Sequence, residues 1–303
     1  MVGSNDEIKV FSGRSNPALT DAICDYLSLA RGRADIETFP DGEFFVKLHD
    51  DVRGRDIFVV QSTCWPVNDN LMELLVFIDC LRRASARRIT AVLPYFGYAR
   101  QDRKDEGRTP ITAKLVSNLI SKAGADRVLA MDLHAPQIQG FFDIPVDHLQ
   151  AAPALFRHFQ NLDYKRVTIV SPDVGNMKRA RMYAQRVGCD LAVIDKRRTS
   201  GSTAVIENII GIVEGRDVLM IDDMIATGGT ISEAARIVKE HGARSVRAAA
   251  THAVFAGPCL ERLQGAPFTE IAVCDTIPVS SAQHERLPSL QVLTVADILG
   301  EAI

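Results

Sequence analysis

Short apolar segments rich in β-branched residues recur along the chain and alternate with longer amphipathic stretches. The apolar segments are residues 8–11, 56–61, 88–93, 127–131, 166–170, 191–194, 218–221, 245–250 and 270–273. Several are apolar throughout instead of at every second position, which is typical of parallel strands covered on both faces. The stretches between them have the length of helices. The alternation predicts an α/β fold in which helices flank mostly parallel sheets on both sides.

The clearest helix start follows residue 108. Thr109 is a good N-cap and Pro110 suits the first helical position, after which Ile111, Leu115 and Leu119 mark one face. We therefore expect an amphipathic helix that begins at Pro110.

An internal similarity indicates two related domains. Residues 124–135 and 242–253 share Gly, Ala, Val and a final His-Ala at the same spacing, and each copy follows a predicted strand, loop and helix. We expect two similar α/β domains, residues 1–149 and 150–303, with a boundary near residues 147–153. A chance match is the alternative, because Gly-Ala before a strand is common.

Composition excludes several classes of protein. Hydrophobic residues make up 47% of the 303 residues and charged residues 24%, as in soluble globular proteins. The net charge of −3 gives no reason to expect a nucleic-acid partner. No apolar run approaches the ~20 residues that cross a bilayer, and the N-terminus lacks the regions of a signal peptide. The six cysteines form no C-x-x-C pair, which favours reduced thiols. We expect a cytoplasmic protein without membrane contact.

The most informative stretch is residues 218–235. An apolar segment ends in Asp222 and Asp223, and the small-residue loop Ala226-Thr227-Gly228-Gly229-Thr230 then leads directly into a predicted helix. A helix N-terminus exposes unpaired N–H groups and a partial positive charge, so it binds phosphate without a lysine. The glycines allow close approach of the backbone, and the threonines add hydroxyl donors. The pattern predicts a phosphate site.

The two carboxylates need a separate explanation, because negative charge beside a phosphate is unfavourable. Asp222 and Asp223 would suit the vicinal hydroxyls of a ribose, aided by a divalent cation. The alternative is an acidic strand end followed by a capped helix. The order of residues 218–230 resembles the ribose-phosphate loop of the phosphoribosyltransferase superfamily, a signature that is specific for the ligand and not for the reaction.

Further motifs narrow the resemblance to one family. Residues 39–43, 68–74, 94–104, 131–134 and 171–173 are similar, in unbroken order, to segments of ribose-phosphate pyrophosphokinases. The resemblance implies two phosphoribosyltransferase-like domains. It also implies transfer of the diphosphate of ATP to C1 of ribose 5-phosphate, which yields phosphoribosyl pyrophosphate and AMP. Two alternatives are a purine-type phosphoribosyltransferase and a catalytically inactive regulatory homologue.

The resemblance also implies roles for individual residues. ATP would lie between subunits of a homo-oligomer, a hexamer built from dimers in this family. The implied ATP residues are Phe39, Asp41, Gly42 and Glu43 at the adenosine end, Arg100, Gln101 and Asp105 from the facing subunit, and His134. Taken alone, residues 40–42 predict only a turn between strands, and residues 100–108 a solvated loop.

The remaining implied residues concern the metal and the chemistry. His134 and Asp173 would help to bind Mg²⁺, directly or through water. Lys196 and Arg198 would belong to a catalytic lid and neutralise charge on the transferring group, because phosphoryl transfer depends mostly on positioning and electrostatic stabilisation. The ribose 5-phosphate ligands would be Asp222, Asp223, Ala226, Thr227, Gly228, Gly229 and Thr230. A lone histidine after a strand and a basic run are more often structural.

Three positions depart from the family pattern. Ala226 stands where the family's loop commonly has Asp, so a side-chain acceptor near the sugar is missing. Asn176 follows Gly175 where a second glycine is usual, which we expect to restrict that turn. The printed chain ends at Ile303, short of the Ser- and Phe-containing tail of many relatives. Phosphate activation and ADP inhibition are therefore not carried over.

Overall fold

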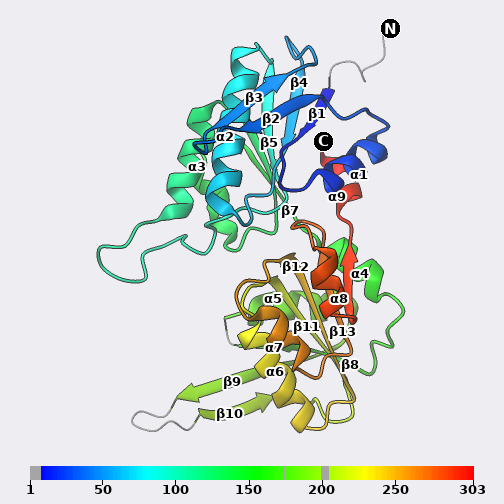
Figure 1. Cartoon of the computed structure of the whole chain (residues 1–303). Coiled ribbons are helices and arrows are strands. Elements are labelled where there is room, and N and C mark those ends of the chain that lie inside the picture. Colours follow the sequence, from blue (N-terminus) through cyan, green and yellow to red (C-terminus); the bar gives the residue numbers. More distant parts are fainter. Residues whose placement is uncertain (1–7, 174, 199–204) are drawn as a thin grey trace. The chain divides into compact units, whose positions relative to one another are not determined.

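The computed structural model describes residues 8–173, 175–198 and 205–303, and the side chains of 196–198 and 205–207 are not part of that description. The chain divides into two units (Figure 1). Unit 1 runs to Ala151 and also includes Thr276–Pro278 and Thr294–Ile303, whereas unit 2 comprises Ala152–Asp275 and Val279–Leu293. The C-terminal segment thus belongs with the N-terminal unit.

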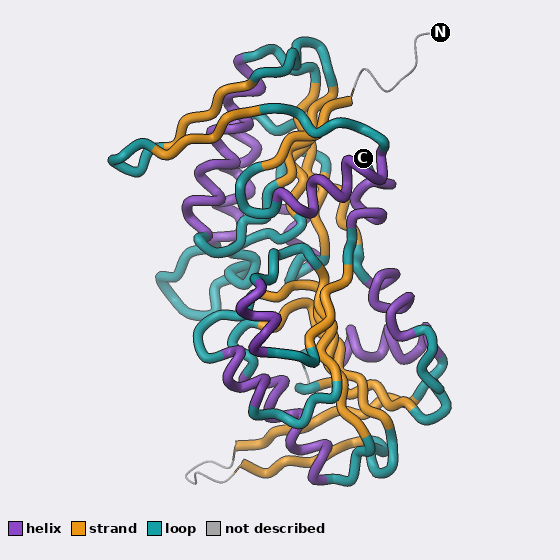
Figure 2. Tube along the Cα trace, turned by 45° about the vertical axis from the view of Figure 1, so that its right-hand side comes forward, coloured by secondary structure: helices purple, strands orange, loops and turns teal. Residues whose placement is uncertain are grey.

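Unit 1 is built on a five-stranded parallel sheet whose strand order follows the chain order. Its strands are β1 (Ile8–Ser12), β4 (Asp56–Val60), β5 (Arg88–Leu93), β6 (Arg127–Met131) and β7 (Val146–Leu149). Its helices are α1 (Pro17–Leu27), α2 (Val67–Arg83), α3 (Thr112–Ala123), the 3-10 helix η2 (Pro136–Phe141) and α9 (Ala296–Ala302). Two further strands, β2 (Ala34–Thr38) and β3 (Phe44–Leu48), form a separate antiparallel hairpin that ends in a tight turn (Figure 2).

Both faces of the unit 1 sheet are buried, as the apolar runs predict. On one face, Phe11 of β1 packs against Phe77 of α2, with ring centroids 5.7 Å apart. The alternate positions Val10, Phe58 and Val92 are buried as well. A strand that is covered on both faces has no position for a polar side chain, and this explains why the segments are apolar throughout.

Unit 2 is built on a seven-stranded sheet that is parallel except at one edge. Its spatial order is β10 (Val205–Ile210), β9 (Asp190–Arg198), β8 (Val167–Ser171), β11 (Asp217–Ile225), β12 (Ser245–Ala253), β13 (Glu270–Cys274) and β14 (Leu290–Leu293). Only β10 runs antiparallel to its neighbour. β9, which follows β8 in the chain, lies on one side of β8, whereas β11 and the later strands β12, β13 and β14 lie on the other side. The β8–β11 junction is therefore a topological switch point, where ligands of open α/β sheets bind.

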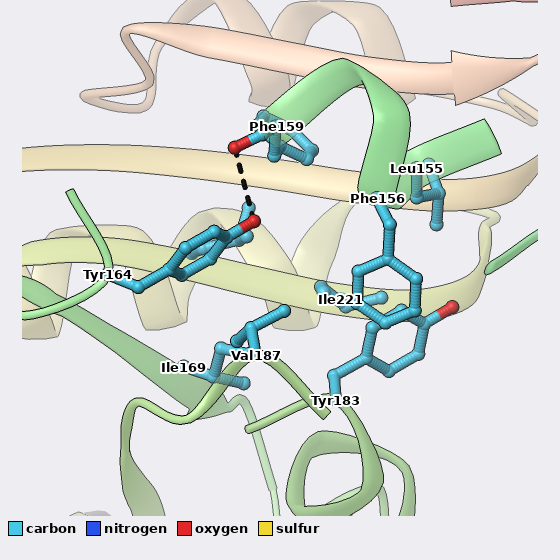
Figure 3. A pocket seen from close by; sticks show the side chains of 9 residues that line it. Leu155, Phe156, Phe159, Tyr164, Ile169, Tyr183, Val187 and Ile221 are labelled. Atoms are coloured by element: carbon cyan, nitrogen blue, oxygen red, sulfur yellow. Dashed lines mark hydrogen bonds between the residues drawn. The ribbon is translucent and has the colours of Figure 1, made fainter. Parts of the chain in front are cut away.

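The described residues of unit 2 form five helices. They are α4 (Ala152–Phe159), α5 (Met177–Val187), α6 (Gly229–Glu240), α7 (Cys259–Gln264) and α8 (Ser281–Arg286). A void lined by Phe156, Tyr183 and other apolar residues lies beside α4 (Figure 3). Its volume of about 10 Å³ is marginal for one water molecule and its lining is apolar, so it is a packing defect and no ligand site.

The structure confirms all nine predicted strands and the internal similarity. Gly124 and Gly242 each end a helix with a positive φ, and β6 and β12 then begin at corresponding places. The predicted start of α3 is wrong. The helix begins at Thr112, and the hydroxyl of Thr109 donates to the Glu106 carbonyl instead of capping it.

Across the described part of the chain, every helix is too short or too polar to span a bilayer.

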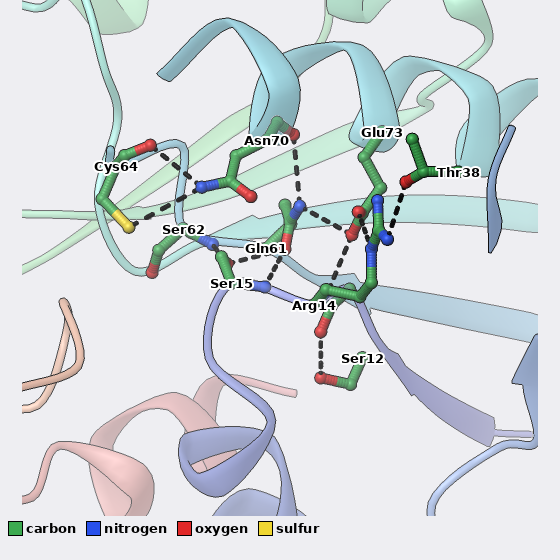
Figure 4. A network of polar contacts seen from close by, with 10 residues as sticks. Ser12, Arg14, Ser15, Thr38, Gln61, Ser62, Cys64, Asn70 and Glu73 are labelled. Carbon is green, nitrogen blue, oxygen red and sulfur yellow. Dashed lines mark hydrogen bonds and ion pairs between the residues drawn. The ribbon is translucent and has the colours of Figure 1, made fainter. Parts of the chain in front are cut away.

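A buried carboxylate organises the loop after β1 in unit 1 (Figure 4). Glu73 of α2 is 2% exposed and accepts hydrogen bonds from the backbone N–H and the Nε of Arg14, at 2.7 and 2.6 Å. Gln61 at the end of β4 donates to the same carboxylate at 3.0 Å, and its own oxygen accepts from the Ser15 hydroxyl. One carboxylate thus joins β1, β4 and α2.

We expect Glu73→Ala to lower the free energy of unfolding by about 2 kcal/mol, because it leaves the Gln61 amide and the Arg14 N–H without their acceptor. Urea titration followed by circular dichroism measures the loss. Asp69→Ala, which removes an exposed carboxylate from the first turn of the same helix, should cost only about 0.5 kcal/mol. Equal losses in the two variants would contradict the role of Glu73.

Candidate functional site

The predicted phosphate loop and Asp173 meet at the switch point of unit 2. Asp173 follows β8, and Asp222 and Asp223 lie in the last part of β11. Asn176 joins the two strand ends, because its backbone N–H donates to the Asp173 carboxylate at 2.8 Å and its side-chain amide donates to the Ile221 carbonyl at 3.0 Å. The backbone of Asn176 has φ −89°, so this turn does not require a second glycine.

An arginine that the sequence analysis missed holds the acidic pair. Arg179 of α5 lies 3.1 Å from the Asp223 carboxylate and 4.0 Å from that of Asp222. Asp223 is buried, whereas the Asp222 side chain keeps 30% of its surface exposed. The pKa of Asp222 is raised to about 8, first by burial and then by the neighbouring Asp223, while Arg179 opposes both effects. The site therefore combines one carboxylate paired with Arg179 and one that takes up a proton near neutral pH.

The loop after β11 has the geometry of an anion site. Gly228 occupies the N-cap of α6 with φ +71°, and no described side chain caps this helix. A Cβ atom on Gly228 would lie 3.1 Å from the sulfur and 3.3 Å from the carbonyl oxygen of Cys259, which is a tight contact. At this positive φ a larger residue is therefore strained. Thr227 and Thr230 are exposed beside it. The first N–H groups of α6 are thus left for a ligand.

Ala226 contributes its backbone to the shape of this loop. Its carbonyl accepts a hydrogen bond from the N–H of Ala256 at 2.9 Å, and the carbonyl of Ile225 accepts from Phe255 at 3.0 Å. These two bonds extend the ladder between β11 and the segment after β12. The loop is therefore anchored at position 226 without an acidic side chain there.

The predicted adenosine residues lie together at the tip of the unit 1 hairpin. Phe39 and Glu43 pair through a backbone hydrogen bond of 2.8 Å, and Gly42 makes the turn with φ +95°. The ring of Phe39 is 42% exposed and stacks on Phe45 at 5.9 Å. The Asp41 carboxylate accepts from the N–H of Glu43. The tip is a turn between strands, as residues 40–42 predict, and it presents an exposed aromatic face.

The second group of predicted ATP residues lies on the loop before α3. Gln101 binds the start of α3, because its carbonyl accepts from the N–H of Ala113 and its side-chain oxygen accepts from the Thr112 hydroxyl. Arg100 is exposed, and Asp105 forms an ion pair with Arg103 at 2.9 Å. None of the described hydrogen bonds or ion pairs joins this loop to the hairpin tip.

The predicted metal residues belong to different units. His134 is exposed and follows β6 in unit 1, and Asp173 follows β8 in unit 2. Within the described residues, no cluster of three or more histidine, cysteine or acidic side chains could hold a metal ion alone.

The predicted catalytic residues lie in β9. Lys196 pairs with Glu207 and Arg198 with Val205 in the antiparallel ladder of β9 and β10. The side chains of Lys196 and Arg198 lie outside the described part of the chain, and so do residues 199–204, which follow them.

Comparisons with known proteins cover nearly the whole chain. A family model described as the N-terminal domain of ribose phosphate pyrophosphokinase matches residues 8–124, and a phosphoribosyl transferase domain model matches residues 147–280. A curated protein from Rhodopirellula baltica named ribose-phosphate pyrophosphokinase is 58% identical, over 98% of this chain and 94% of the relative. One of the same name from Gloeobacter violaceus is 51% identical, over 99% and 90%.

A solved structure agrees with these relatives. The crystal structure of phosphoribosylpyrophosphate synthetase from Mycobacterium smegmatis aligns with a TM-score of 0.91 and 41% identity. The alignment covers 98% of this chain and 97% of that one. The expected fold, two phosphoribosyltransferase-like α/β domains, is confirmed.

The raised pKa of Asp222 predicts a pH-dependent loss of stability. Asp222 is neutral in the folded protein up to about pH 8 and ionised in the unfolded chain above its ordinary pKa of 3.8. The folded state thus binds the extra proton, and the stability it provides is lost as pH rises toward 8. Asp222→Asn cannot ionise, so wild type should lose stability relative to this variant between pH 5 and pH 8. Urea titrations at both pH values measure the difference, and parallel pH profiles would contradict the prediction.

Proposed function

We propose a residue-level mechanism from one premise: this chain belongs to the ribose-phosphate pyrophosphokinase family. It is an enzyme that transfers the diphosphate of ATP to C1 of ribose 5-phosphate and releases AMP. Close relatives that carry this name match almost the entire chain, so the phosphoribosyltransferase alternative is set aside. The proposal concerns which residues bind each substrate, how charge is neutralised, and how the chain assembles.

The loop at the switch point is the proposed site for ribose 5-phosphate. The observation that carries this proposal is the α6 N-terminus behind Gly228, which no described side chain caps and which begins beside an acidic pair. The N–H groups and hydroxyls of residues 227–230 would bind the 5-phosphate, while Asp222 and Asp223 would accept from the ribose hydroxyls. Ala226 would contribute only backbone, which its bond from Ala256 supports.

The hairpin tip is the proposed site for the adenosine end of ATP. The exposed ring of Phe39 supports stacking on a base, and the carboxylates of Asp41 and Glu43 would accept from the base or its ribose. We propose that Arg100, Gln101 and Asp105 contact the nucleotide from a facing subunit. Within one chain, no described hydrogen bond or ion pair joins this loop to the hairpin tip, which is consistent with ATP contacts from two different subunits.

The chemical step is in-line displacement at the β-phosphorus of ATP. The C1 hydroxyl oxygen forms a bond to the β-phosphorus and gives up its proton to solvent. The bond from the β-phosphorus to the α–β bridging oxygen breaks, and AMP leaves with that oxygen. Lys196 and Arg198 would neutralise the charge that spreads over the transferring group, where most of the catalytic effect of phosphoryl transfer arises. Closure of the proposed lid that carries Lys196 and Arg198 would exclude water, the competing acceptor.

Mg²⁺ is the proposed cofactor, and the donor set in unit 2 fits it. Magnesium prefers oxygen ligands and is usually bound by one or two carboxylates together with substrate phosphates. One oxygen of the Asp173 carboxylate accepts from Asn176, which leaves the other as an acceptor for the ion or its water. The absence of a three-ligand cluster in the described residues agrees with an ion held mainly by phosphate. His134 would contribute through a bound water, because magnesium binds imidazole weakly. When bound, the ion would neutralise phosphate charge.

We propose that the enzyme works in the cytoplasm as a homo-oligomer, a hexamer built from dimers. Six thiols without a disulfide, all in the described residues, support a reducing compartment. Ile111, Leu115 and Leu119 are 37%, 55% and 41% exposed and form an apolar stripe along α3. The core-facing side of that helix is instead Ala113, Val116, Ser117 and Ile120. An exposed stripe of large apolar residues is typical of a protein contact.

Lys196→Ala should lower turnover by on the order of 10³-fold with ATP, ribose 5-phosphate and Mg²⁺, because one charge opposite the transferring group is lost. Release of AMP, followed by chromatography, measures turnover and also tests the inactive-homologue alternative. Lys165→Ala, at the opposite end of the sheet before β8, is the matched control and should retain wild-type turnover. Unchanged turnover in Lys196→Ala would remove Lys196 from the mechanism.

The double variant Leu115→Glu with Leu119→Glu should form smaller particles than wild type, because charge on the apolar stripe opposes association. Light scattering coupled to size-exclusion chromatography measures the mass. Ser121→Glu adds charge to the same helix on a side away from the stripe and should keep the native mass. A double variant of native mass would exclude this stripe from the subunit contact.

A further inference from the structure

The short helix α7 packs against the proposed phosphate loop, residues 226–230. Figure 1 shows it beside α6, the helix that begins with this loop, and the two are in contact. Cys259 and Arg262 lie one helical turn apart on α7 and face the loop. The sulfur of Cys259 is 3.1 Å from a Cβ placed on Gly228, and the Nη1 of Arg262 is 3.3 Å from one placed on Gly229. Both loop glycines are therefore packed against α7.

The two supporting side chains act differently. Cys259 is fully buried, and burial raises the pKa of its thiol to about 12, so it is a neutral packing group. Arg262 is exposed and its Nη1 donates a hydrogen bond to the carbonyl of Thr227 at 3.0 Å. Arg262 thus contacts a backbone carbonyl within the proposed ribose 5-phosphate loop.

The direction of this carbonyl matters for phosphate binding. In a trans peptide the C=O of one residue and the N–H of the next point in opposite directions. A bond that turns the Thr227 oxygen toward Arg262 therefore turns the N–H of Gly228 the opposite way. Without that bond the peptide is able to rotate, and its oxygen would then repel a phosphate at the place where an N–H should attract it.

The positive charge of the Arg262 guanidinium also favours phosphate binding at this loop. Residues 222–230 contain two aspartates and no basic residue. Arg262 brings a cation to the loop from a position 35 residues later in the chain. Because the side chain is exposed, solvent screens this charge, and the hydrogen bond to Thr227 is the larger effect.

We propose that Arg262 is a positioning residue for ribose 5-phosphate. Arg262 holds the Thr227 carbonyl away from the 5-phosphate, so that the N–H groups of the loop face the phosphate. The proposal rests on the proposed function, in which residues 222–230 bind the sugar phosphate. Loss of the hydrogen bond from Arg262 should weaken the affinity for ribose 5-phosphate. The affinity for ATP and the rate of the chemical step should not change.

Steady-state kinetics of three variants test the proposal. Arg262→Met keeps the apolar stem but removes the donor, and it should raise the KM for ribose 5-phosphate about tenfold. The KM for ATP and kcat should stay within about twofold of wild type. Arg262→Lys keeps a charged donor one bond shorter and should recover part of the loss, to a KM about threefold above wild type.

Arg236→Met is the matched control. Arg236 of α6 is exposed and also donates to a backbone carbonyl, that of Gly265 at the far end of α7, at 3.4 Å. This variant loses the same charge and the same kind of bond to α7, and it should keep wild-type constants for both substrates. If the two methionine variants have the same effect, Arg262 acts by general support of α7 and the proposal is wrong.

A loop variant separates failure of the inference from failure of the proposed function. Gly228→Ala strains the loop itself and should raise the KM for ribose 5-phosphate if this loop is the sugar-phosphate site. If Gly228→Ala raises that KM and Arg262→Met does not, only the role of Arg262 is overturned. If neither variant changes it, the proposed site is wrong as well. Should Arg262→Met fail to fold, Arg262→Lys decides, because a wild-type KM there overturns the proposal.

Discussion

The pairing of β8 with β11 is the constraint on which the site depends. These two strands are neighbours in the sheet although α5, β9 and β10 separate them in the chain. Their successors β9 and β12 lie on opposite sides, so right-handed crossovers place α5 and α6 on opposite faces of the sheet. The strand ends are therefore left uncovered between the two helices. Asp173 and Asp222 follow at those ends, and Asn176 and Arg179 close the gap by binding Ile221 and Asp223.

The same arrangement explains how an acidic pair tolerates an anionic substrate. One carboxylate, Asp223, is compensated by Arg179, and the other, Asp222, is neutral over much of the neutral pH range because burial opposes its ionisation. The proposed phosphate loop, residues 226–230, itself adds no charge and would bind through N–H groups and hydroxyls. Arg179 and Arg262 approach from α5 and α7, outside the loop sequence. The local charge at the proposed ribose 5-phosphate site thus depends on Arg179 and Arg262, which are distant from the loop in sequence.

Sequence patterns predicted the parts of the fold where burial is uniform. The interiors of β4 and β11, residues 57–60 and 218–221, are buried and apolar at every position, and the positions of both strands followed from that feature alone. The hairpin strands β2 and β3 are mixed in burial and exposed along one side, so no apolar run marked them. The roles of Arg179 and Arg262 were not predictable either. Each acts across a gap of more than 30 residues, and only strand order brings those segments together.

Strand order also explains why the two related units contribute differently. The strand–helix–strand unit around Gly124 and the one around Gly242 share their local geometry, yet the unit 1 sheet follows the chain order without a reversal. The strand order of unit 1 therefore contains no switch point like that between β8 and β11. The proposed nucleotide residues of unit 1 accordingly lie on a hairpin tip and a long loop, which are surfaces suited to contact with a second subunit.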